Sequence, residues 1–223
     1  FTHKATAPDP WMDHPVTFVA SPYKTATSTV GKAVIALGVH SREMTHQRKL
    51  QQTHKGLFKQ VNALSRGART WARFVQNGEH DQVREILAPV LAAARRFDVF
   101  ADAPLGHTHI HPFARRAIAP NSKFIWVHRD PEDWLASVRR WEESHPEIYP
   151  RHVFWTSHPK RRPRQLAELW RRNLDHFHRL AEVFPEDCLE IDIADLDDYT
   201  KLAAFYGVEA PDAPLKRYNV NSG

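Results

Sequence analysis

The stretch that decides the fold runs from residue 15 to residue 38 and reads PVTFVASPYKTATSTVGKAVIALG. Its first six residues form a short apolar, β-branched run, which is typical of a buried strand. Val30, Val34 and Leu37 then follow at spacings of four and three, on one face of a helix that Gly38 would end. The segment therefore predicts a strand, a polar loop and a helix in succession.

The same alternation of strands and helices continues along the chain. The predicted strands are 98–102, 123–128 and 188–191, and the predicted helices are 57–64, 83–94, 131–141, 166–184 and 199–206. Asp130 is a good N-cap for the helix that starts at Pro131. Such alternation implies a mainly parallel sheet with helices on both faces, so we expect a three-layer α/β/α fold. We expect a single domain over 1–223, with a lid or surface excursion at 144–164, which holds four prolines.

Composition narrows the class of protein. The 223 residues suit one domain, and 42% hydrophobic with 26% charged residues is ordinary for a soluble chain. No run reaches the roughly 18 apolar residues of a membrane helix, so we expect no membrane span. The single cysteine, Cys188, and the lack of a visible signal peptide favour a cytoplasmic location. The net charge of +5 favours an anionic ligand.

The loop after the first strand has the features of an anion site. Backbone N–H groups at a helix start are unpaired and point at the ligand, and hydroxyls and a lysine would add donors. Gly31-Lys32 invites the nucleotide-triphosphatase pattern GxxxxGK[ST], but Ala26 and Ala33 stand where that pattern needs a glycine and a hydroxyl. The helical spacing also puts Gly31 inside the helix, beyond the loop.

A later strand is followed by an arginine and a serine. Arg129 comes directly after the strand 123–128, and Ser137 stands eight positions further on, two turns into the next helix. A guanidinium matches phosphate oxygens, and a serine at that distance along the helix can hydrogen-bond the same group. Ligands of such folds bind at the carboxyl ends of the strands, where the loops after Ala20, Asp102 and His128 should converge.

Together these two elements resemble the sulfotransferase family, bacterial-type members in particular. The loop Ser21-Pro22-Tyr23-Lys24-Thr25-Ala26-Thr27-Ser28 resembles the family's 5′-phosphosulfate loop, and Arg129 with Ser137 resembles its 3′-phosphate pair. The resemblance implies that the cofactor is 3′-phosphoadenosine 5′-phosphosulfate (PAPS), with 3′-phosphoadenosine 5′-phosphate (PAP) as product and no metal. The residues that it implies for nucleotide binding are Lys24, Thr25, Ala26, Thr27, Ser28, Arg129 and Ser137. One departure is Ala26, which replaces the usual loop glycine and would strain a loop that needs positive φ.

The implied reaction moves a sulfuryl group from PAPS to a hydroxyl or amine of an acceptor. Lys24 would neutralise charge on the bridging and leaving oxygens. A base should take the acceptor's proton, and Asp102, at the end of a strand, matches the family's position for it. His107 is the near alternative, and Glu43, His40 and His46 are further ones. The acceptor, a small molecule or a carbohydrate, is not predicted by the sequence, and neither is an oligomeric state.

Two other functions compete with this one. A phosphate-loop kinase would need an acidic strand end that holds magnesium, for which Asp192 and Asp102 are weak candidates. A non-catalytic nucleotide- or glycan-binding module could use a basic cluster. That cluster comprises Arg161, Arg162, Arg164, Arg171 and Arg172. It is local and has no accompanying nucleic-acid motif, so we expect no nucleic-acid partner.

The alternating histidines His107, His109 and His111 would share a face if they lay on a strand, as metal ligands do. No carboxylate or cysteine partner is evident near them in the sequence. We therefore predict no metal site there.

Overall fold

The computed structural model describes residues 14–41, 43–45, 77, 88, 92, 94–103, 105–107, 111–145 and 162–218. Within them lies a five-stranded sheet of order β2-β3-β1-β4-β5 in which each neighbouring pair is parallel. The strands are β1 (Val16–Val19), β2 (Met44–Thr45), β3 (Val99–Phe100), β4 (Ser122–His128) and β5 (Cys188–Asp192). This confirms the predicted α/β fold with a parallel sheet.

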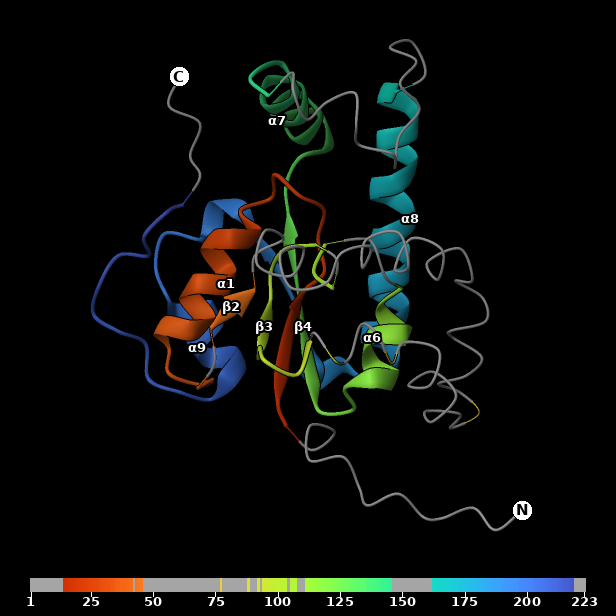
Figure 1. Ribbon diagram of the computed structural model, residues 1–223. Helices are drawn as coiled ribbons and strands as arrows, with labels where there is room; N and C mark the ends of the chain where they lie inside the picture. The colour runs from red at the N-terminus through yellow and green to blue at the C-terminus, as the bar shows by residue number, and fades with distance from the viewer. Residues whose placement is uncertain are drawn as a thin grey trace.

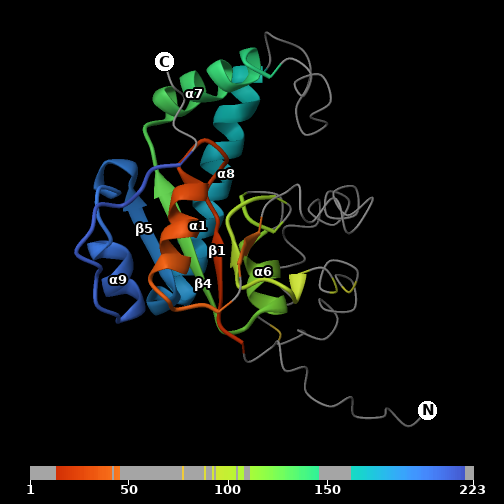
Figure 2. The same cartoon turned by 60° about the vertical axis from the view of Figure 1, so that its left-hand side comes forward.

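Helices cover both faces of the sheet, α1 and α9 on one and α6 and α8 on the other (Figures 1 and 2). The helices are α1 (Thr27–Ala36), α6 (Pro112–Ile118), α7 (Pro131–Glu143), α8 (Arg162–Val183) and α9 (Thr200–Tyr206), with short 3₁₀ turns η2 (Pro185–Asp187) and η3 (Ile193–Asp195). None of the described helices combines the length and the apolar character that a membrane crossing requires.

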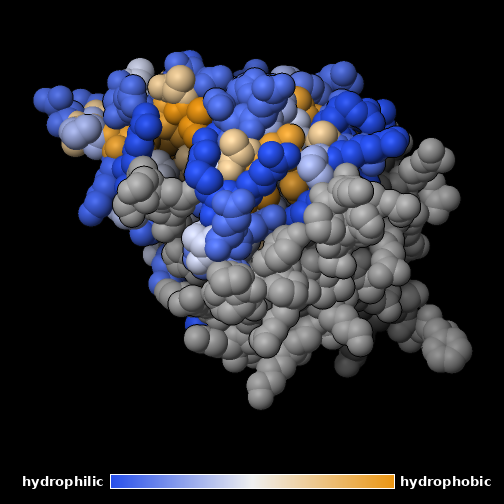
Figure 3. All heavy atoms as spheres, turned by 90° about the horizontal axis from the view of Figure 1, so that it is seen from above, coloured by the Kyte–Doolittle hydropathy of each residue, from blue (hydrophilic) through white to orange (hydrophobic). Residues whose placement is uncertain are grey.

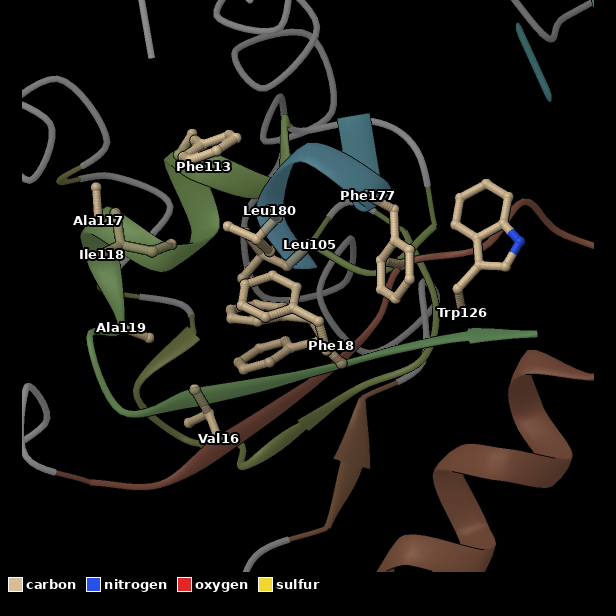
Figure 4. Close-up of a cluster of buried hydrophobic side chains, with 14 of the residues drawn as sticks. Val16, Phe18, Leu105, Phe113, Ala117, Ile118, Ala119, Trp126, Phe177 and Leu180 are labelled. Atoms are coloured by element: carbon tan, nitrogen blue, oxygen red, sulfur yellow. The ribbon is translucent and has the colours of Figure 1, made fainter. Parts of the chain in front are cut away.

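The core consists of two buried clusters, one on each face of the sheet. Successive residues of a strand point to opposite faces, so Phe18 joins the cluster beside α6 and α8 while Val19 joins the cluster beside α1. Phe18 lies inside this cluster (Figure 4). The centre of its ring is 5.1 Å from that of Phe100 and 5.3 Å from that of Phe124. Burying each such side chain contributes about 1.5–3 kcal/mol, which anchors the three central strands to one another.

Gly31 explains how α1 lies so close to the sheet. A Cβ on Gly31 would lie 2.3 Å from Sδ of Met44 and 2.5 Å from Cβ of Ala101. The glycine therefore serves helix–sheet packing, and its place inside α1 agrees with the rejection of the triphosphatase pattern.

Several sequence predictions differ from the structure or lie outside the described residues. The strand β2 and the helix α6 were not predicted. The two residues of β2 are too few for a periodic pattern, and the seven residues of α6 are too few to show helical periodicity. The predicted helix 57–64 lies outside the described residues, as does most of the helix 83–94 and of the lid 144–164. α8 already begins at Arg162, so the last three residues of the predicted lid are helical.

His107 and His111 do not lie on a strand, and His109 lies outside the described residues. His107 lies in a turn with φ of 55°, and His111 is the N-cap of α6. Its ring accepts a hydrogen bond from the backbone N–H of Phe113 at 3.3 Å. Among the described residues no group of three or more histidine, cysteine or carboxylate side chains is arranged to hold a metal ion.

Candidate functional site

The segments that follow β1, β3 and β4 meet at the carboxyl edge of the sheet, where ligands of parallel α/β folds bind. The backbone N–H of His107 donates to the carbonyl of Val19 at 2.9 Å, and that of Ala20 donates to Ile125 at 2.8 Å. These bonds fasten the segment after β3, and the start of the loop after β1, to neighbouring strands. The predicted convergence of the three segments is therefore present.

The loop between β1 and α1 is held in an unusual backbone conformation. Lys24 and Ala26 both have left-handed backbones, with φ of 66° and 61°. Left-handed residues in a turn direct backbone N–H groups toward a common point, which is how anion-binding concavities form. Ala26 is also the N-cap of α1 and makes no side-chain capping hydrogen bond. The N-terminal end of α1 thus points its N–H groups into the loop without a side-chain cap.

Ala26 therefore does occupy the conformation in which the family's usual glycine is unstrained. A left-handed backbone costs roughly 1–2 kcal/mol for a residue with a Cβ. The surrounding contacts hold the loop in this shape in spite of the alanine.

Two threonine hydroxyls stiffen the loop from within. The buried Thr25 Oγ1 donates to the carbonyl of Pro22 at 2.7 Å and is hydrogen-bonded to Ser21 Oγ at 2.9 Å. Thr27 Oγ1 lies 3.2 Å from Nε2 of His107, on the segment after β3. The hydroxyls of Thr25 and Thr27 hold the loop together, and Ser28 remains half-buried. For Thr25 and Thr27 the backbone N–H is thus the natural ligand donor.

Arg129 reaches back to this loop. Its Nη1 donates to the carbonyl oxygen of Lys24 at 2.9 Å, across 105 residues of sequence. Ser137 is buried in α7, with 4% of its surface exposed. Asp130 accepts hydrogen bonds from Glu132 and Asp133 N–H groups at 2.9 and 3.1 Å, which confirms it as the N-cap. The cap fixes the start of α7 next to Arg129.

Two tryptophans of α7 complete the support of the loop, and the sequence pattern had assigned them only a helix face. Trp134 Nε1 donates to the carbonyl of Tyr23 at 2.7 Å. Nζ of Lys24 lies 6.0 Å from the centre of the Trp141 ring. The sequence signal that could have indicated this shared role is their seven-residue spacing, which places both rings on one side of the helix.

Lys24 and Arg129 lie in a strongly positive environment. Burial lowers the pKa of Lys24 from 10.5, and the nearby Arg129 and Arg140 guanidinium groups lower it further. Burial also lowers the pKa of Arg129, Arg140 adds to this, and Asp133 opposes it. Both pKa shifts mean that the protonated forms of Lys24 and Arg129 are destabilised in the free protein. A bound anion would stabilise these positive charges.

Asp102 begins the turn that follows β3. Its Oδ1 accepts the N–H of Ala103 at 2.8 Å, and its carbonyl accepts the N–H of Gly106 at 2.8 Å. A Cβ on Gly106 would lie 2.6–2.7 Å from backbone atoms of Asp102 and Phe100, so glycine is needed for this close approach. The tight turn returns His107 to the side of Asp102.

His107 lies between Asp102 and the loop. Its Nε2 is 3.7 Å from Oδ1 of Asp102 and 3.2 Å from Oγ1 of Thr27. Burial lowers the pKa of His107 below its usual 6.5, and Arg115 lowers it further, while Asp102 and a hydrogen bond with the Ala101 backbone oppose the shift. The imidazole is therefore neutral near pH 7 and can accept a proton.

Arg115 of α6 is a support that the sequence did not indicate. Only 1% of its surface is exposed, and its Nη2 donates to the carbonyl of His107. Burial lowers its pKa to about 9. A single arginine in a short helix carries no pattern that predicts such a contact.

The other candidate bases lie elsewhere. Glu43 directly precedes Met44, the first residue of β2, and is therefore at the amino edge of the parallel sheet. His40 bonds to Thr17 near the start of β1, with Nε2 2.8 Å from Oγ1. Both are at the edge opposite the loop, and His46 lies outside the described residues. The structure therefore brings Asp102 and His107 to the loop, but neither Glu43 nor His40.

Acidic partners within the chain engage much of the basic cluster. Arg162 Nε donates to Glu142 at 3.0 Å. Arg164 pairs with Glu168 at 3.1 Å and Arg171 with Asp175 at 3.3 Å, each four residues apart on α8. Arg161 lies outside the described residues. These pairs weaken the case for a separate anion-binding surface on α8.

Comparison with known proteins agrees with this geometry. The model of the sulfotransferase domain family matches residues 17–182, which include the loop, Asp102, Arg129 and Ser137. The chain therefore belongs to the sulfotransferase domain family. A search of curated proteins found no significant match.

Proposed function

We propose that this protein transfers the sulfuryl group of PAPS to a hydroxyl or amine of a small-molecule or carbohydrate acceptor. The observation that carries the proposal is the hydrogen bond from Arg129 to the carbonyl of Lys24. It holds Arg129 against the loop, which supports one site for a nucleotide with phosphates at both the 5′ and the 3′ position. The family match supports sulfuryl transfer in general.

In the proposed complex each element has one role. The backbone N–H groups of residues 24–28 bind the 5′-phosphosulfate, and Lys24 neutralises charge on the bridging oxygen as it leaves. Arg129 and Ser137 bind the 3′-phosphate. No residue of this set needs a metal ion.

The base in this proposal is the pair of Asp102 and His107. Asp102 already accepts the Ala103 N–H, while His107 is a neutral imidazole close to Thr27 of the loop. As the acceptor oxygen attacks sulfur, its proton passes to His107, the bond between sulfur and the bridging oxygen breaks, and PAP leaves with that electron pair. Asp102 then stabilises the imidazolium, 3.7 Å away.

The variant Arg129→Ala tests the donor site. It should weaken PAP binding by about 1.5–3 kcal/mol, roughly ten- to 150-fold in Kd, because a charged hydrogen bond to phosphate is lost. Titration calorimetry without added metal measures this. Adenosine 5′-phosphosulfate, which lacks the 3′-phosphate, is the matched control, since its Kd should change little. Equal losses for both ligands would remove Arg129 from the 3′-phosphate role.

A further inference from the structure

One side of α7 carries a row of polar residues that includes Ser137 and ends one turn beyond it. Asp133, Ser137 and Arg140 follow at spacings of four and three, so they lie along one side of the helix. Arg140 is exposed, and so is its neighbour Arg139, which points about 100° further round the helix. Both residues are exposed arginines, but their side chains leave the helix in different directions.

Packing against the loop brings this end of α7 close to Lys24. The rings of Tyr23 and Trp141 lie 5.9 Å apart, and Trp141, directly after Arg140, lies 6.0 Å from Nζ of Lys24. The α7 end of the molecule is seen from above in Figure 3, where hydrophilic residues cover most of the described surface. Arg140 is exposed, and its neighbour Trp141 contacts the loop, so Arg140 lies near the loop.

The charges around this point are unbalanced. The positive charge of Arg140 acts on both Lys24 and Arg129, and Arg129 acts on Lys24 as well. Asp133 offsets part of the charge at Arg129. Among the described residues Arg140 has no ion pair or side-chain hydrogen bond. Three cations with one nearby carboxylate form a site that an anion would stabilise.

We propose that Arg140 is a third cationic ligand of the nucleotide, which binds its phosphates together with Lys24 and Arg129. This rests on the proposed function and adds a residue to its donor site. The row from Ser137 to Arg140 extends the 3′-phosphate pair by one turn of the helix, and an exposed guanidinium can reach a bound phosphate without displacing any internal partner. Arg140 would favour bisphosphorylated over monophosphorylated nucleotides.

Arg140→Ala tests the proposal, with Arg139→Ala as the matched control. Calorimetry with PAP should show roughly three- to tenfold weaker binding for Arg140→Ala, as expected for an exposed charge on a phosphate, and no change for Arg139→Ala. High salt should shrink the difference, because it screens exposed charges. Equal affinities of the two variants would overturn the assignment while leaving the donor site intact.

A second readout works without nucleotide. Removing the charge of Arg140 should raise the pKa of Lys24, because that charge lowers it in the native protein. Lys24 should then react more slowly with an amine-specific reagent at a fixed pH near 9, as followed by peptide mass spectrometry, and Arg139→Ala should match the native rate. Unchanged Lys24 reactivity in Arg140→Ala would contradict the proximity of the two charges. Failure of the native protein to bind PAP would instead overturn the proposed function.

Discussion

Asp102→Asn is expected to lower the rate of sulfuryl transfer by about 10² to 10⁴ and to leave PAP affinity unchanged. The substitution keeps the shape of the side chain and an oxygen for the Ala103 N–H, but it removes the charge that would stabilise the His107 imidazolium. Transfer is followed with sulfur-labelled PAPS and an acceptor found by screening phenols, alcohols, sugars and amines.

His107→Asn should cause a loss of similar size. Asparagine tolerates the left-handed backbone that His107 adopts, with φ of 55°, so the turn can persist without the imidazole. If the two residues act as one unit, the double variant should be little worse than either single one. Near-normal transfer by either single variant would remove that residue from the base.

The pH dependence of sulfuryl transfer is an independent test of the pair of Asp102 and His107. Asp102 raises the pKa of His107 against the effect of burial, so the asparagine variant should have a still lower imidazole pKa. The pH at which activity falls on acidification should therefore be lower in Asp102→Asn than in the native protein. A shift in the opposite direction would contradict the pairing.

Lys24→Ala is expected to lower turnover by about 10² to 10³, the usual cost of removing one group that stabilises developing charge. PAP affinity should fall by much less, because the charge on the leaving oxygen grows only in the transition state. The measurement is kcat with saturating PAPS, together with the Kd of PAP.

Lys32 provides the matched control for this variant. It belongs to the rejected triphosphatase pattern and comes after the first turn of α1, and its Nζ lies 3.6 Å from the centre of the Tyr218 ring. Lys32→Ala should keep near-normal turnover. A large loss in Lys32→Ala with little loss in Lys24→Ala would mean that the loop register is wrong.

The local part of the fold could be predicted from sequence because its signals are local. β1, the loop and α1 follow one another within a single stretch, and Asp130 with Pro131 marks the start of α7 by capping rules alone. β2 could not be predicted, since its two residues are defined only by pairing with β3. The short α6 lacks an apolar run long enough to show helical periodicity.

The sequence predicted candidate residues for the site but not the contacts between them. The positions of Lys24 and Arg129 follow from strand ends, but the hydrogen bond between them depends on the sheet order, in which β1 and β4 are neighbours. The approach of His107 to Thr27 depends on a tight turn at Gly106 and on a buried Arg115. Such contacts come from tertiary packing, which no local pattern encodes.

Thermal unfolding with PAP in the presence of EDTA tests the central claim most directly. A hundredfold excess over Kd should stabilise the protein by about 2.7 kcal/mol, or roughly 5–11 °C in Tm for a chain of this size. ATP with magnesium, the ligand that a phosphate-loop kinase would prefer, should give a smaller shift. A larger shift with ATP and magnesium, or equal shifts with PAP and 5′-AMP, would contradict a site built for a nucleotide with a 3′-phosphate.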